Sequence, residues 1–99
     1  MQDIAVNFLR RSRAIIEAAE RGLVTEEELT AGRNSMNELL EQDWVMPRAV
    51  SEVSIHWKLI EESLRTILEG KSSTQTSADE LQAAWTAYNN IENALQDHQ

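Results

Sequence analysis

The chain has 99 residues, carries a formal net charge of −8 and contains no cysteine. This length fits one domain with a single hydrophobic core, and the lack of cysteine excludes disulfides, thiolate nucleophiles and cysteine-ligated metals. The acidic charge repels nucleic-acid phosphates and favours basic partners. We therefore expect no direct binding of nucleic acid, although Arg10, Arg11 and Arg13 form one small basic cluster.

The amino-terminal stretch MQDIAVNFLRRSRAII does not have the order of a signal peptide. An acid precedes its apolar residues, and arginines interrupt them. No apolar run in the chain approaches the roughly 20 residues that span a bilayer. We expect a cytoplasmic protein that does not interact with membranes.

Two helices are predicted in the first part of the chain, over residues of about 3–21 and 26–42. In the first, apolar residues recur in pairs and form a broad stripe, and Gly22 follows where a left-handed C-terminal cap is expected. Thr25 and Glu28 have the spacing of a capping box at the start of the second. Gly32, inside this helix, costs roughly 1 kcal/mol relative to alanine, which favours a close helix crossing at that point.

The third predicted helix, over residues of about 47–69, has the strongest pattern in the chain. Pro47 suits its first turn, and Gly70 stops it. Apolar residues spaced by three and four positions place one narrow seam along it. The seam consists of Val50, Val53, Trp57, Ile60, Leu64 and Ile67.

The polar segment 71–77 is predicted to be a mobile linker, because it has no apolar anchor. Ser77 and Glu80 then form a second capping-box pattern that starts a fourth helix over about 78–96. Ala83, Ala87 and Ala94 line one face of this helix, on which another backbone is able to approach closely. The predicted fold is a single all-α domain over residues 1–99, a four-helix bundle-like arrangement with a long third helix, and oligomeric.

The chemistry-bearing residues of the third helix favour no catalytic or metal site. Glu52 and His56 share a face one turn apart, as an acid–base pair or two metal ligands would, but a boundary pair is the commoner arrangement. Glu61 and Glu62 project about 100° apart, so they cannot act on one atom. We interpret both as solvated charges, with Glu61 placed to pair with Arg65. We expect no enzyme activity, no cofactor and no metal.

Two groups of apolar residues are candidates for a protein interface. Ile55 and Leu59 lie nearly opposite the core seam, one turn apart. Trp44, Val45 and Met46 occupy the loop before Pro47, where they either anchor a partner or plug the end of the fold.

The predicted function is that of a small acidic helical regulator that binds another protein, as an adaptor, antirepressor or inhibitor does, by occupying the partner's surface. A homo-oligomer is also expected, because the chain has more apolar surface than one small core uses. Two alternatives remain at this stage. The first is a nucleic-acid mimic that blocks a nucleic-acid-binding protein, and the second is a secretion-type chaperone that holds a partner helix in a groove.

Overall fold

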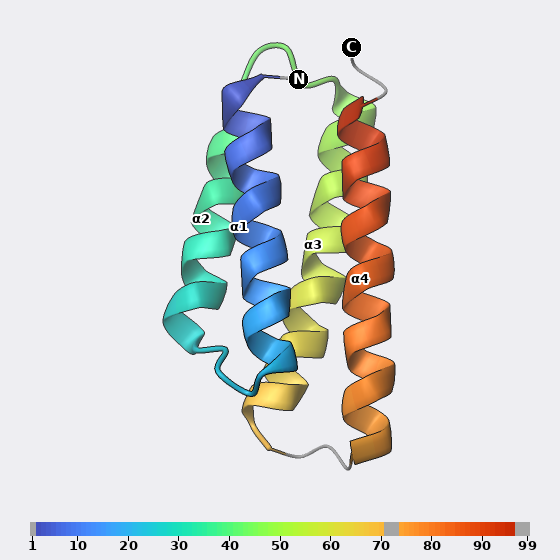
Figure 1. Ribbon diagram of the computed structural model, residues 1–99. Coiled ribbons are helices and arrows are strands. Elements are labelled where there is room, and N and C mark those ends of the chain that lie inside the picture. The colour runs from blue at the N-terminus through green and yellow to red at the C-terminus, as the bar shows by residue number, and fades with distance from the viewer. Residues whose placement is uncertain (1, 71–73, 97–99) are drawn as a thin grey trace.

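The computed structural model describes residues 2–70 and 74–96, which form four helices and no strand. Helices that follow one another in the chain run in opposite directions and lie side by side (Figure 1). The molecule measures 41 × 21 × 16 Å, so its long axis follows the helices. The predicted all-α class is confirmed. The helices are α1 (Asp3–Glu20), α2 (Glu26–Leu40), α3 (Pro47–Leu68) and α4 (Thr74–Gln96).

The turn after α1 is set by a glycine, as the sequence predicts. Gly22 has a φ of 71°, in the left-handed region that side chains with a Cβ disfavour. The amide of Leu23 donates to the carbonyl of Ala18 at 2.8 Å, and the amide of Gly22 donates to that of Ala19 at 3.0 Å. These two bonds make a Schellman motif, which satisfies the last carbonyls of α1 and reverses the chain into α2.

The starts of α2 and α3 also follow the predicted signals. Thr25 Oγ1 accepts from the amide of Glu28 at 3.2 Å, and its hydroxyl lies 3.2 Å from the Glu28 carboxylate. Pro47 is in the first turn of α3, where its missing amide hydrogen costs no helical bond. Gly70, with a φ of 68°, follows the end of α3.

The fourth helix differs from its prediction. It begins at Thr74 rather than near residue 78, so residues 74–77 of the expected linker are helical. Residues 71–73 of that linker lie outside the described part of the chain. Residues 74–77 contain neither glycine nor proline, so nothing in the backbone stops α4 from extending beyond the capping pattern at Ser77. The other helices end one or two residues before their predicted ends, which is the usual uncertainty at a helix terminus.

The core lies between the four helices and contains the predicted seam of α3. Val53, Trp57, Ile60 and Leu64 are buried, and the two ends of the seam are partly buried against the same core. The other helices contribute mainly aliphatic side chains. The largest of their buried residues are Phe8, Ile16, Leu29, Leu39, Ile91 and Leu95.

The indole of Trp57 is the largest buried side chain and contacts two other helices. Phe8 of α1 meets it edge to face, with ring centroids 6.0 Å apart. Gly32 of α2 lies directly against the same ring: a Cβ at that position would be 2.8 Å from Trp57 Cζ2 and 2.9 Å from Ile15 Cδ1. A close contact is therefore present at Gly32, but its neighbours are the side chains of Trp57 and Ile15 rather than the backbone of a crossing helix.

This contact generates a test of the packing. Gly32→Ala should lower the free energy of unfolding by about 1–3 kcal/mol, because the added methyl overpacks the Trp57 ring. Helix propensity alone predicts a gain of about 1 kcal/mol from the same change. Urea denaturation followed by circular dichroism measures the difference, with Thr30→Ala at an exposed position of α2 as the control. A stabilised Gly32→Ala variant would show that Gly32 packs less tightly against the Trp57 ring than the structure indicates.

Candidate functional site

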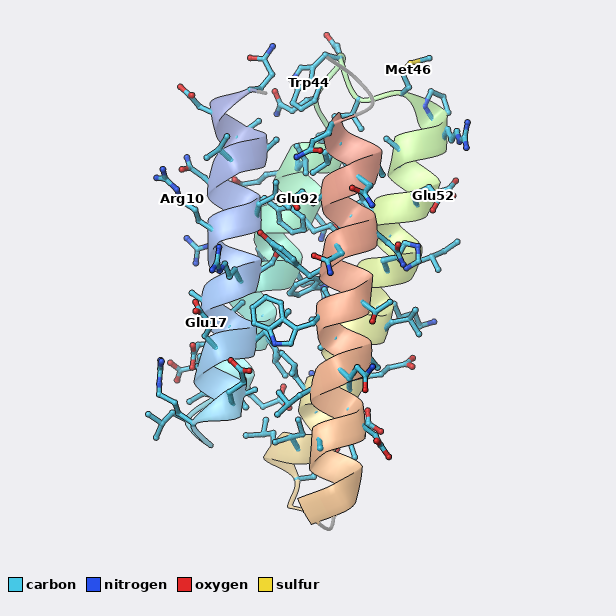
Figure 2. The ribbon with its side chains drawn as sticks, turned by 45° about the vertical axis from the view of Figure 1, so that its right-hand side comes forward. Arg10, Glu17, Trp44, Met46, Glu52 and Glu92 are labelled. Carbon is cyan, nitrogen blue, oxygen red and sulfur yellow. The ribbon has the colours of Figure 1, made fainter. Side chains whose placement is uncertain are left out.

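A furrow runs along the outer side of the molecule, between α3 and α4. It consists of two grooves of about 490 and 430 Å³ that share His56 and Asn90. The upper groove extends toward Met46, at the start of α3, and the lower groove extends toward Asp79, near the start of α4. Met46 and Glu52 lie on this outer side of α3, whereas Arg10 and Glu17 lie on the far side of the molecule (Figure 2).

Small and polar side chains of α4 open the furrow. The residues that α4 contributes are Asp79, Gln82, Ala83, Thr86, Ala87, Asn90, Asn93 and Ala94. Their spacing of three and four positions places them on one helix face. The sequence pattern already indicated a small-residue face from Ala83, Ala87 and Ala94, but it did not identify Asn90 or Asn93. Only the pairing of α4 with α3 brings these asparagines opposite His56.

The two off-seam aliphatic residues of α3 lie beside this furrow. Ile55 is 60% exposed and Leu59 is 46% exposed, and Leu59 also lines the lower groove. A single exposed aliphatic residue needs no functional explanation. Two of them one turn apart, next to a groove lined mainly by small and polar side chains, have the composition of a protein contact site.

The three apolar residues of the loop before α3 were predicted either to anchor a partner or to plug the end of the fold, and they differ in this respect. Val45 is only 7% exposed and Trp44 is partly buried against the core, so both close the end of the molecule near the start of α3. Met46 is 59% exposed and lines the upper groove. The structure thus brings Met46 and Leu59 to one furrow and leaves Trp44 and Val45 in the packing of the fold.

Glu52 and His56 form a pair at the middle of the furrow. The Nε2 atom of His56 lies 3.4 Å from Glu52 Oε2. The Nδ1 atom is buried, and no described residue hydrogen-bonds it. Within the described residues, no group of three His, Asp or Glu side chains is arranged to hold a metal ion. The two side chains therefore form a close polar contact at the boundary of the core.

Glu61 lies in a polar network on the side of α3 that faces α2. Arg33 of α2 binds its carboxylate through two nitrogens, and its Nε–Oε1 distance is 3.0 Å. Trp57 Nε1 donates to Oε1 at 3.2 Å, and Arg65 approaches Oε2 at 3.4 Å. Arg65 also binds Glu26 of α2 at 2.8 Å.

The network corrects one interpretation of the sequence. Glu61 is not a solvated charge, because its side chain is only 13% exposed. Its carboxylate also accepts hydrogen bonds from three residues, Arg33, Trp57 and Arg65. Its predicted pairing with Arg65 is present. Arg33 was missed because it is 28 positions away in the chain, and no local spacing indicates such a contact.

These partners lower the pKa of Glu61 below its ordinary value near 4.5. The main cause is the hydrogen bonding from Arg33, and the partial burial of the carboxyl opposes it. The positive charges of Arg33 and Arg65 and the Trp57 N–H group add to the lowering. The same network raises the pKa of Arg33, chiefly through its hydrogen bond to Glu61.

No family model matches the chain, and no curated protein or solved structure is significantly similar to it. No helix among the described residues is long and apolar enough to cross a membrane.

The lowered pKa of Glu61 predicts how stability depends on pH. The ionised carboxylate stabilises the fold above pH of about 4.5, and this contribution is lost as the pH falls through the lower pKa of the folded state. Glu61→Gln should cost about 1 kcal/mol at pH 7. The difference from the unchanged protein should shrink as the pH falls through this lowered pKa, because the carboxyl then becomes neutral.

Urea denaturation at a series of pH values measures this difference. Glu38→Gln, at an exposed position of α2, is the matched control and should have little effect at any pH. A Glu61→Gln penalty that does not decrease at any acid pH at which the protein stays folded would contradict the assigned role of the charge.

Proposed function

We propose that the protein is a small acidic regulator that binds another protein through the outer face of α3 and α4, in the cytoplasm. The observation that carries the proposal is the juxtaposition of Ile55 and Leu59 with the furrow. An apolar ridge beside a groove has the shape that a partner helix requires, since helices associate by placing ridges into grooves. Met46 adds an adaptable apolar contact at the upper end.

The proposed mechanism is occupation of the partner's surface. The furrow offers small and polar groups along its length and exposed aliphatic groups beside them. A partner would bury the aliphatic groups and form hydrogen bonds with the polar ones. Its acidic surroundings favour partners that carry basic residues around an apolar contact. An adaptor, an antirepressor and an inhibitor would all act in this way.

The small number of acidic residues in the furrow supports this function over that of a nucleic-acid mimic. A mimic binds through arrays of carboxylates, and its binding weakens steeply with salt. Among the described residues, the furrow is lined by two acidic side chains, Glu52 and Asp79, together with Arg48. Binding through this face should therefore persist at salt concentrations that screen surface charges, where the Debye length falls to about 3 Å near 1 M.

The proposal is tested with the double variant Ile55→Asp/Leu59→Asp. Affinity capture from an extract of the source cells, with nuclease and at low and high salt, identifies bound proteins by mass spectrometry. A protein held by the unchanged chain should be lost with the double variant, and titration of the purified pair should show affinity weakened at least about tenfold. Helicity should stay unchanged, because both positions are exposed.

Leu23→Asp is the matched control, because Leu23 is 63% exposed and lines neither groove. It belongs to the turn between α1 and α2, which lies at the opposite end of the molecule from the loop before α3 (Figure 1). It should retain the partner. Equal capture by the control and the double variant would refute binding through the furrow, and capture that vanishes at high salt would favour the mimic.

A further inference from the structure

The outward side of α3 carries a second stripe, opposite the seam that faces the core. Its members alternate at spacings of four and three residues, as on a helix face that packs along another helix. Four of the five are exposed, and Glu52 is partly buried beside His56. The stripe consists of Arg48, Glu52, Ile55, Leu59 and Glu62.

We infer that a second copy of this chain covers the stripe, with the two α3 helices antiparallel and crossing at Ile55. The inference rests on the proposed function, because it concerns the same face, and it names the occupant of that face in the isolated protein. Two-fold symmetry makes every contact occur twice, since the same patch is used on both subunits.

The charges of the stripe complement themselves only when the helices are antiparallel. Arg48 lies seven residues before Ile55, and Glu62 lies seven residues after it. Antiparallel crossing at Ile55 therefore brings Arg48 of each copy to the level of Glu62 of the other. Parallel helices in register would instead place like charges opposite each other, which costs binding energy.

The furrow supplies a matching shape for the same arrangement. Leu59 lies four residues after Ile55, so Leu59 of the second copy reaches the level of Ser51 on the first. This level falls within the upper groove, which extends from Met46 to His56 along α3. The ridge of each copy thus meets a groove of the other, and the exposed aliphatic side chains leave the solvent.

The charge of the whole chain restricts where a second copy is able to bind. Two molecules of net charge −8 repel each other on most of their surfaces. The stripe holds one Arg and two Glu side chains, so its own net charge is only −1. Two like copies therefore meet most easily on this stripe, where charges of both signs are present and few.

A charge exchange between Arg48 and Glu62 tests the arrangement. The variants are Arg48→Glu, Glu62→Arg and the combination of both. The two positions are about 21 Å apart along one helix, so they cannot compensate for each other within a single chain. Analytical ultracentrifugation over a range of concentrations should give twice the 11.3 kDa chain mass for the unchanged protein.

Each single variant should weaken the dimer about tenfold, because the two-fold axis repeats every new repulsion. The combined variant should recover the original dissociation constant within about threefold. Circular dichroism confirms that the exposed substitutions leave the helices intact. A monomer at every concentration, or a combined variant weaker than either single one, would overturn the inference.

The absence of native cysteine allows a second, independent measurement. Ile55→Cys should form a disulfide-linked dimer under mild oxidation, because two copies of this position meet near the two-fold axis. Glu27→Cys, exposed on α2, is the matched control and should remain largely unlinked. Equal cross-linking of the two variants would overturn the crossing point.

The results also separate this inference from the proposed function. A monomeric protein that captures a partner through Ile55 and Leu59 would overturn self-association and leave the proposed function standing. A dimer that shows charge rescue, with partner capture unaffected by changes at Ile55 and Leu59, would support self-association and refute the proposed binding through the furrow.

Discussion

The packing of one indole ring constrains the arrangement of three helices. Trp57 fills the space between α1, α2 and α3, and it can do so only because α2 presents a glycine where any other residue would place a Cβ inside the ring. The helix-propensity cost of Gly32, roughly 1 kcal/mol, is smaller than the gain from burying a large aromatic side chain. A residue unfavourable to its own helix therefore stabilises the whole fold.

The same ring links the core to the polar network. The Trp57 N–H group points out of the apolar interior and donates to Glu61, which the two arginines also bind. Because the network joins α2 to α3 through Arg33 and Arg65, it adds polar contacts to the apolar packing between these two helices.

Local signals in the sequence predicted most of the fold. Gly22 and Gly70 mark turns, Thr25 marks a helix start, and the spacing of the Trp57 seam identifies the buried side of α3, because each depends on neighbours within one or two turns. The predicted start of α4 was wrong because a capping pattern marks a position where a helix is able to begin. It does not prevent the helix from beginning earlier in the chain. Contacts between distant segments, such as Arg33 with Glu61, have no local signature.

The candidate site shows the same division between local and long-range information. The exposure of Ile55 and Leu59 follows from the period of α3, but the furrow beside them exists only because α4 presents small and polar residues at that level. One helix of this chain therefore carries two stripes with different requirements. The inner stripe is apolar throughout and determines the fold, whereas the outer stripe combines two aliphatic residues with opposite charges at its ends, and opposite charges determine which surface can pair with it and in which direction.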